Sequence, residues 1–521
     1  IRPVQYERAE QQYNTDIYCR MYRSVDELLA YAHQTSPKVY RPFIMTEYLH
    51  TMGNSGGGLK EYMEVFESEP VVQGGCIWDW VDQSFREVDA HGKWYWAYGG
   101  DYGPENIPSF GNFCCNGLVN AVREPHPHLK EVKKAYQYIK CTLKDPKNLT
   151  IAIKNWYDFT NLNAYVLKWS IMGDNGKMLA NGEQSIEVAP HATTEVSLGG
   201  VRLPRNIREA YLNLSWTPKK KSAFIGTDDE VAYDQFVLPA NSQYRPTLAK
   251  LSEKPEIQID PKTGALTSYI YEGQEYLASP VRLSLYRPAT DNDNREKKGG
   301  AKVWRKLGLN HLVQRVLSVK TSGHTTYSEV KLLNDKNETI GSATFEYTIR
   351  KDGILSVQTR FVPDTTFVSS LARVGLVFEM PHSFNRVTYL GRGEHETYAD
   401  RKLSGRIGIY HTDAERMFHY YVRPQATGNR TDVRWMQVSD ELEKGLSVWG
   451  EKPFEFSVSP FTDEHIDAAG HINELKSNGT VTVPLDALQS GVGTDTCGPG
   501  VLAPSLVPVQ EYLFSFEIST L

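Results

Sequence analysis

Short apolar runs alternate with helical patterns over the first 80 residues. Strand-like runs occupy residues 16–22, 43–45 and 71–77, and short continuous apolar runs are typical of strands buried on both faces of a parallel sheet. A Ser-x-x-Glu capping box at Ser24 predicts a helix after the first run, and apolar spacing from Leu59 predicts another after the second. This alternation is typical of a (β/α) barrel, of which three strands are expected here.

The pattern changes near residue 140. A helix with apolar residues at helical spacing is predicted to close the barrel part, its positions being Leu129, Val132, Tyr136 and Ile139. Alternating runs follow at residues 149–153, 165–169 and 211–216, separated by turn signals such as Asp174-Asn175-Gly176. Their extent of about a hundred residues is typical of an immunoglobulin-like β-sandwich. Pro239 and Pro246 frame a predicted linker.

The remaining strand-rich segment predicts a large, mostly antiparallel β-sandwich. The acidic run Asp291-Asn292-Asp293-Asn294 lacks the Gly and Glu of a calcium loop and is interpreted as a turn. The predicted domains are residues 1–139 as the C-terminal part of a catalytic barrel, 140–245 as the immunoglobulin-like sandwich and 246–521 as the large sandwich.

Composition argues against nucleic acid and membranes as partners. A formal charge of -6 gives no basic face for nucleic acid, and no apolar run reaches membrane-spanning length. The six cysteines lack metal-finger or redox spacing and are expected to be free thiols, which favours a cytoplasmic location. Because residue 1 is Ile, the true N-terminus is expected to be missing, so a periplasmic location stays open.

Candidate chemistry lies at the ends of the predicted barrel strands, where such barrels place reactive groups. Glu47 closes the run 43–45, and Trp78-Asp79-Trp80-Val81-Asp82-Gln83 closes the run 71–77. Taken alone, Glu47 is better interpreted as a solvated turn residue or a charge at a helix entry.

Two long motifs change that interpretation. The stretch from Thr46 to Asn54 and the Trp78–Gln83 run together resemble the bacterial β-galactosidases of glycoside hydrolase family 2, as do the runs 390–394, 398–401 and 491–495. The resemblance covers the whole chain and implies the C-terminal half of such an enzyme. It implies hydrolysis of terminal β-D-galactosides with retention, a lactose-type sugar as substrate and a homo-oligomer.

The resemblance also implies roles for particular residues. Glu47 would be the nucleophile, Tyr22 would hydrogen-bond it, and His50 would contact the sugar. Two carboxyl groups about 5 to 5.5 Å apart are needed for retention. The family's acid/base Glu lies more than seventy residues before the nucleophile, so it is expected to be absent from this chain, and Asn337-Glu338 and Asn473-Glu474 are no substitute.

Sugar and cation contacts are implied in the same way. Trp78 and Met21 would contact the substrate, and the Phe113 carbonyl with the Asn116 amide oxygen would form part of a sodium site. Cys497 stands where some relatives have a tryptophan beside the leaving group. The magnesium ligands and the remaining sodium ligand are expected upstream. We therefore expect the chain to need the missing N-terminal half as a partner and to be inactive alone.

Other functions stay open. A family 2 β-glucuronidase would carry Asn-x-Lys to bind a sugar carboxylate, whereas Asn116-Gly117-Leu118 offers no cation. A β-mannosidase is less favoured because of the long C-terminal domain. The other class is a non-catalytic carbohydrate-binding or assembly fragment, supported by the missing acid.

Overall fold

The computed structural model describes residues 2–104, 106–241, 251–295, 300–364 and 370–521. The chain divides into two compact units. The first comprises Ile1–Glu131, Ala249–Gly405 and Tyr410–Leu521, and the second comprises Val132–Leu248 with Arg406–Ile409. The prediction for Pro246 lies outside the described residues.

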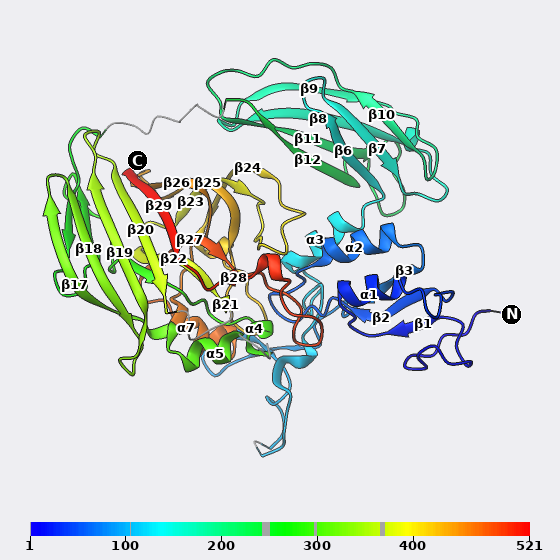
Figure 1. Cartoon of the computed structure of the whole chain (residues 1–521), viewed down its shortest axis with the longest axis horizontal. Helices are drawn as coiled ribbons and strands as arrows, with labels where there is room; N and C mark the ends of the chain where they lie inside the picture. The colour runs from blue at the N-terminus through cyan, green and yellow to red at the C-terminus, as the bar shows by residue number, and fades with distance from the viewer. Residues whose placement is uncertain (1, 105, 242–250, 296–299, 365–369) are drawn as a thin grey trace. The chain divides into compact units, whose positions relative to one another are not determined.

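A small parallel sheet opens the first unit. Its strands are β1 (Tyr18–Arg20), β2 (Phe43–Tyr48) and β3 (Val72–Ile77), paired in the order β1-β2-β3. Helices α1 (Val25–Ala32) and α2 (Leu59–Ser68) connect them and lie beside the sheet (Figure 1). The predicted capping box is confirmed, because the Ser24 side chain accepts from the Glu27 backbone N–H while Glu27 accepts from the Ser24 N–H.

The segment after this sheet is irregular. It contains a hairpin of β4 (Phe85–Val88) and β5 (Trp94–Ala97), the 3₁₀ turn η1 (Gly111–Cys114) and helix α3 (Pro127–Ala135). The predicted closing helix is wrong in its length. It ends at Ala135, and Ile139 begins a strand in which its side chain is fully buried. Periodicity alone could not separate the two, because a buried position continues either pattern.

The second unit holds two antiparallel sheets, ordered β10-β7-β6 and β12-β11-β8-β9. Its elements are β6 (Ile139–Asp145), β7 (Thr150–Asn155), η2 (Leu162–Ala164), β8 (Tyr165–Gly173), β9 (Met178–Gln184), β10 (Thr193–Ser197), β11 (Glu209–Pro218) and β12 (Ala232–Pro239). Alternating residues of these strands form one apolar core that includes Ile151, Ile171 and Trp216. This is the half-buried pattern predicted from the alternation.

A twelve-stranded sheet dominates the rest of the first unit, and the strand pairings described for it are antiparallel. The order is β16-β22-β27-β26-β29-β20-β19-β18-β17, with β23, β24 and β25 branching from it. The strands are β16 (Arg282–Ser284), β17 (Val313–Ser322), β18 (Thr325–Leu333), β19 (Thr339–Ile349), β20 (Leu355–Pro363), β22 (Arg373–Pro381), β23 (Arg386–Arg392), β24 (Ile407–Asp413), β25 (Arg430–Ser439), β26 (Gly445–Phe456), β27 (Thr480–Gln489) and β29 (Tyr512–Thr520). The prediction of a large antiparallel β-rich segment is confirmed.

Smaller elements complete the first unit. The remaining strands are β13 (Glu256–Ile259), β14 (Leu266–Tyr271), β15 (Gln274–Glu275), β21 (Ser370–Leu371) and β28 (Val507–Pro508). The helices are α4 (Asp291–Arg295), α5 (Gly300–Lys306), α6 (Ala414–Met417) and α7 (Asp463–Ala468), with the 3₁₀ turns η3 (Leu309–His311), η4 (Ile472–Glu474) and η5 (Ala503–Ser505).

The interpretation of Asp291–Asn294 as a turn is wrong, since these residues begin the short helix α4. Thr290 caps it: the Thr290 hydroxyl accepts from the Asp293 N–H at 3.0 Å, and Asp293 accepts in return from the Thr290 N–H at 3.0 Å. The reciprocal cap satisfies backbone donors at the helix start. Short polar residues favour turns and helix caps alike, so the sequence did not distinguish them.

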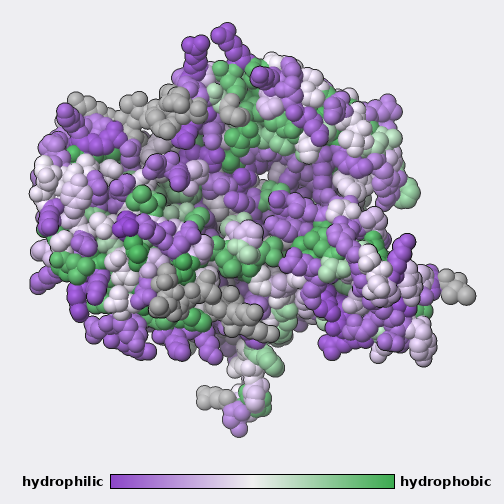
Figure 2. Space-filling model, viewed as in Figure 1, coloured by the Kyte–Doolittle hydropathy of each residue, from purple (hydrophilic) through white to green (hydrophobic). Residues whose placement is uncertain are grey.

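The visible surface is mostly hydrophilic, with small apolar patches scattered among polar residues (Figure 2). Among the described residues, no helix is both long enough and apolar enough to cross a membrane.

Candidate active site

Glu47 and Tyr22 lie side by side. β1 and β2 run parallel, and their register ends with Arg20 opposite Met45, two positions before Tyr22 and Glu47. The Tyr22 hydroxyl donates to Glu47 Oε2 at 2.6 Å, and the Tyr22 N–H donates to the Glu47 carbonyl at 2.9 Å. The structure thus brings together the predicted nucleophile and its predicted hydrogen-bond donor, at the C-terminal end of β2.

The Tyr22 phenol is suited to donate a hydrogen bond to Glu47 at neutral pH. Partial burial raises the pKa of its phenol, and the hydrogen bond to Glu47 and the charge of that carboxylate raise it further. The phenol therefore keeps its proton at neutral pH. Within the described residues, Glu47 accepts a side-chain hydrogen bond from Tyr22 alone, so its other oxygen keeps its lone pairs available.

His50 lies just beyond, with 1% of its surface exposed. Its Nδ1 is 2.7 Å from the Thr496 hydroxyl, and its Nε2 is 3.3 Å from the Asn116 amide nitrogen. Burial, followed by the charge of Arg295, lowers the pKa of His50 to about 4, so the ring is neutral at pH 7. The ring also stacks on Phe113 at 5.4 Å.

Phe113 and Asn116 are joined through η1. The Asn116 amide nitrogen donates to the Phe113 carbonyl at 3.0 Å. The Asn116 amide oxygen is buried and has no hydrogen-bond partner among the described residues. The amide oxygen is thus an unsatisfied buried acceptor, while the amide nitrogen on the same side chain faces the Phe113 carbonyl.

The other predicted contact residues lie at the same strand ends. Trp78 follows β3 and is 39% exposed, so it is not a buried barrel tryptophan. Met21 directly precedes Tyr22 and is half-buried. Cys497 is an exposed free thiol whose pKa is raised by partial desolvation and then by the charge of Glu47.

Glycines hold the segment carrying Thr496 and Cys497 close to the loop after β2. Gly57 donates its N–H to the Gly493 carbonyl at 3.3 Å, and a Cβ at Gly57 would meet an Asp400 carboxylate oxygen at 2.0 Å. Asp400 in turn accepts from the N–H groups of Val492 and Gly493. The runs 56–58, 398–401 and 491–495 therefore meet at one point, and only a residue without a side chain fits position 57.

Helix α4 also holds segments of the site in place through hydrogen bonds. Asn292 accepts from the Thr496 N–H at 2.9 Å, and its amide donates to the carbonyls of Val492 and Gly493. Asp291 accepts from the Asn112 amide at 3.0 Å. The acidic run that lacked a predicted role thus fixes both the Thr496 segment and the η1 turn.

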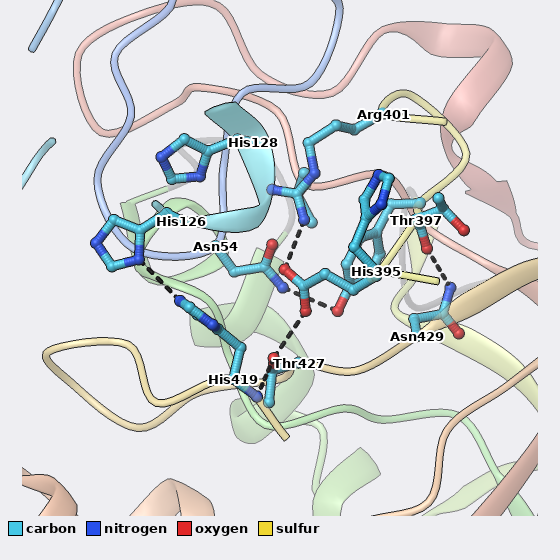
Figure 3. Close-up of polar contacts among 12 residues, drawn as sticks. Asn54, His126, His128, His395, Thr397, Arg401, His419, Thr427 and Asn429 are labelled. Atoms are coloured by element: carbon cyan, nitrogen blue, oxygen red, sulfur yellow. Dashed lines mark hydrogen bonds and ion pairs between the residues drawn. The ribbon is translucent and has the colours of Figure 1, made fainter. Parts of the chain in front are cut away.

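A buried ionic network anchors the end of the 46–54 motif (Figure 3). Glu396 accepts from Arg401 at 2.7 Å, from the Tyr421 hydroxyl, and from the Thr427 hydroxyl and the Gly428 N–H at 2.7 Å each. Although burial alone would raise it, the Arg401 charge holds the pKa of Glu396 at about 2.

Asn54 and its neighbour connect the motif to this network. The Asn54 amide donates to the Tyr398 hydroxyl and the Ala426 carbonyl at 2.8 Å each, and Arg401 donates to the Ser55 carbonyl. Asn54 and Arg401 accordingly point into the same buried cluster (Figure 3). The loop that carries His50 is therefore fixed by residues some 350 positions later in the chain.

Sequence reasoning missed Thr496, Asn292 and Arg295. Arg295 ends α4 and lies over the Phe113 ring, its guanidinium carbon 5.2 Å from the ring centre. All three reach the site from the distant β-rich segment. The motif run 491–495 directly before Thr496 was the available signal.

Family models match three segments of the chain. Residues 1–141 match "Glycosyl hydrolases family 2, TIM barrel domain", and residues 151–239 match "Beta-galactosidase, domain 4". Residues 252–518, which are more than half of the chain, match "Beta galactosidase small chain". The chain belongs to the bacterial β-galactosidases of glycoside hydrolase family 2. The predicted resemblance is confirmed.

Curated relatives of this family 2 chain carry the same name. The β-galactosidase of Priestia megaterium is 34% identical over 527 residues, covering 97% of this chain and 50% of the relative. β-Galactosidase 2 of Enterobacter cloacae is 30% identical over 556 residues, covering 99% and 53%. The chain spans about half the length of the curated relatives it matches.

A solved Bacteroides uniformis β-glucuronidase 2, covalently bound to cyclophellitol-6-carboxylate aziridine, matches at 11% identity with a TM-score of 0.21. The match covers 98% of this chain and 46% of the β-glucuronidase chain. A likeness at this level carries no argument about fold or function.

Proposed function

We propose that the full-length protein containing these 521 residues hydrolyses terminal β-D-galactosides with retention, and that Glu47 is the nucleophile. The observation that carries the proposal is the 2.6 Å hydrogen bond from Tyr22 to one oxygen of Glu47, whose second oxygen has no hydrogen bond to the residues that the structure describes. Relatives named β-galactosidase at 30 to 34% identity support the choice of sugar.

The reaction follows from these residues. The free oxygen of Glu47 attacks the anomeric carbon and forms a glycosyl ester, while Tyr22 fixes the other oxygen and orients the carboxylate. We propose that neutral His50 donates from Nε2 to the sugar in place of its contact with Asn116, and that exposed Trp78 supplies a flat apolar surface for one sugar face. Water then cleaves the ester, so two inversions restore the original configuration.

A second carboxyl group is required to protonate the leaving oxygen. We propose that it comes from residues outside this chain, in the part of the relatives' length that the chain does not span. The rate contribution of such an acid is about 10² to 10⁴. We accordingly propose that the chain by itself is inactive and that it needs the N-terminal half of the protein as a partner. We also propose that the full-length protein forms a homo-oligomer.

A sodium ion fits the Phe113 and Asn116 oxygens. In the present orientation the Asn116 amide leaves its oxygen buried and unpaired. The opposite amide orientation would let His50 Nε2 donate to that oxygen, but it would set the oxygen against the Phe113 carbonyl, a repulsion that a cation relieves. When bound, the ion would help to hold a sugar hydroxyl.

A magnesium site, unlike the sodium site, has no candidate ligands among the residues discussed above. The described residues contain no group of three or more His, Cys, Asp or Glu side chains that could hold a metal ion. We propose that the magnesium ligands, like the acid, lie outside this chain.

The test of the nucleophile is chemical rescue. Glu47→Gly in the full-length protein should hydrolyse no aryl galactoside, and added azide should restore leaving-group release and give α-galactosyl azide, because azide occupies the emptied side-chain space. Glu61→Gly, which removes a carboxylate of helix α2, is the matched control. Full activity of Glu47→Gly without azide would overturn the proposal.

A β-glucuronidase is the alternative, and Arg295 is the observation that favours it. The sequence motif at Asn116 offers no cation, yet the structure sets the Arg295 guanidinium over Phe113. Turnover of matched aryl galactoside and aryl glucuronide should favour the galactoside in the wild type. If the glucuronide is preferred and Arg295→Gln abolishes that preference, the alternative replaces the galactosidase.

A further inference from the structure

Asp82 lies in the Trp78–Gln83 run, and its carboxylate is almost fully buried. The residue is 4% exposed, and both carboxylate oxygens accept hydrogen bonds. Oδ1 accepts from the Gly117 N–H at 2.8 Å, and Oδ2 accepts from His126 Nε2 at 2.7 Å. A buried carboxylate paired in this way is held in one position, and this one bonds directly to the residue that follows Asn116.

A chain of hydrogen bonds extends from Asp82 through two histidines. His126 Nδ1 is 2.8 Å from His419 Nε2 (Figure 3). Because a carboxylate only accepts, His126 donates from Nε2, and the Nδ1 of the neutral ring then accepts from His419. His126 is 4% exposed and has partners on both sides, so its ring is held in one orientation. The ring in turn fixes the Asp82 carboxylate.

The peptide group that joins Asn116 to Gly117 is held at both of its ends. Its N–H donates to Asp82, and its carbonyl accepts from the Thr51 hydroxyl at 2.6 Å and from the Asp79 N–H at 2.7 Å. A Cβ at Gly117 would meet the Asp82 backbone nitrogen at 2.2 Å, so only glycine allows this close approach. Because this peptide directly follows the Asn116 Cα, its orientation sets the direction in which the Asn116 side chain leaves the backbone.

We propose that Asp82 is a positioning residue for the reaction, which holds the peptide after Asn116 and thereby sets the place of the Asn116 amide. The nitrogen of that amide lies 3.0 Å from the Phe113 carbonyl and 3.3 Å from His50 Nε2. This inference rests on the proposed function, in which Asn116 and His50 serve the bound sugar. Within the described part of the chain, the Asp82 side chain makes no hydrogen bond to Glu47 or His50, so it acts through Asn116.

Loss of the Asp82 carboxylate should weaken sugar binding more than it weakens the fold. Thr51 and Asp79 still hold the carbonyl of the same peptide, and His128 Nε2 still donates to the Gly117 carbonyl at 2.9 Å. The segment therefore stays in its loop while its exact orientation is lost. Hydrogen bonds weaken steeply when distance or angle departs from the preferred range, so a small displacement is enough to impair a contact with the substrate.

Hydrogen exchange tests the positional part without any activity. In the full-length protein, Asp82→Ala removes the acceptor of the Gly117 N–H, and mass spectrometry should show faster exchange in the peptide that spans residues 113–119. Asp234→Ala is the matched control, because Asp234 likewise accepts from one side chain and one backbone N–H. Unchanged exchange in Asp82→Ala, or equally fast exchange of this peptide in Asp234→Ala, would overturn the proposal.

Kinetics separate a positioning role from a general loss of stability. Asp82→Ala should raise KM for an aryl galactoside at least several-fold while kcat falls much less, because the sugar contact is weakened in the ground state and the transition state alike. Asp82→Asn should restore most of the KM, since its amide oxygen still accepts from Gly117 and its NH₂ pairs with the other tautomer of His126. An unchanged KM in Asp82→Ala, or a fall in kcat alone, would overturn the proposal.

A second variant keeps this test decisive where Asp82→Ala does not fold. Asp82→Ser carries the same expectation, because its shorter side chain fills part of the space but cannot bridge Gly117 and His126. Asp234→Ala should leave KM and kcat unchanged. A KM that rises equally in Asp234→Ala would contradict a local role of Asp82.

A double-mutant cycle tests whether Asp82 acts through Asn116. Asn116→Ala alone should raise KM, and adding Asp82→Ala should change KM little further, because the side chain that Asp82 positions is already gone. Fully additive effects would overturn the proposal, since Asp82 would then act independently of Asn116.

The proposed function can fail separately from this inference. Galactoside turnover with an unchanged KM in Asp82→Ala would overturn the role of Asp82 and leave the proposed function standing. A wild type that hydrolyses an aryl glucuronide and no galactoside would overturn the proposed function, and the same variants measured with the glucuronide would still decide the role of Asp82.

Discussion

Two glutamates of the first unit each accept a hydrogen bond from a tyrosine, yet they stand in opposite environments. Glu47 is half-buried and, among the described residues, is bonded through its side chain to Tyr22 alone. Glu396 is 4% exposed and accepts four hydrogen bonds, including one from Arg401. The first carboxylate keeps an oxygen free, whereas the second has none to spare.

The difference matches the reactive role proposed for Glu47 and a structural role for Glu396. A buried charge is tolerated when it is paired and fully hydrogen-bonded, and Glu396 meets that condition. A nucleophile needs the reverse, because an oxygen saturated with donors is a poor attacking group. A single oriented donor such as Tyr22 fixes the carboxylate while leaving one oxygen available. The comparison predicts that changes at Glu396 act on stability and changes at Glu47 act on chemistry.

The largest expected effect on stability comes from Arg401→Met. Removing the cation leaves Glu396 charged and unpaired in the interior, which should lower the free energy of unfolding by about 3 to 5 kcal/mol. The matched control is Arg360→Met, which breaks an exposed pair with Glu511 and should change the free energy of unfolding little. Calorimetry of both variants checks the prediction. Equal shifts of their melting temperatures would show that burial does not distinguish the two pairs.

Acid should remove the contribution of Glu396. Its folded pKa of about 2 lies below the unfolded value of about 4.3, so its stabilisation is complete above pH 4.3 and is lost as pH falls toward 2. The expected loss is on the order of 3 kcal/mol over that window. The melting temperature of Glu396→Gln should therefore fall less than that of the wild type between pH 5 and pH 3. Parallel curves for the two proteins would contradict the assignment of a depressed pKa.

Tyr22→Phe should act on turnover and leave the fold intact. Loss of a hydrogen bond to a charged group is worth about 1.5 to 3 kcal/mol, which corresponds to a fall of roughly 10- to 100-fold in kcat for aryl galactosides. The melting temperature should change little, since the ring and its packing remain. A large loss of stability with unchanged kcat would place Tyr22 with the structural group.

Strand-end chemistry was predictable because it depends on local order. The apolar run 43–45 predicts a strand that ends near Glu47, whereas the role of Glu47 and its pairing with Tyr22 came from the resemblance of the motifs. The capping box at Ser24 is likewise local. The long motifs gave the family, since they record several such local requirements at once.

Contacts between distant segments were not predictable. Thr496 reaches His50 across 446 positions, and Asn292 reaches Thr496 across 204. Nothing in the spacing of either residue records that approach, because it is set by packing of the large sheet and its loops. The contact of Arg295 with Phe113 was not predictable either, because Arg295 lies at the end of α4, and the sequence predicted a turn where this helix begins.

Covalent trapping tests the central claim most directly. The full-length protein is incubated with a slow 2-deoxy-2-fluoro-β-galactoside, and the labelled peptide is identified by mass spectrometry. The expected result is one fluorogalactosyl group, carried as an ester by Glu47. A label on any other carboxylate, or turnover of galactosides without a trappable ester, would contradict it.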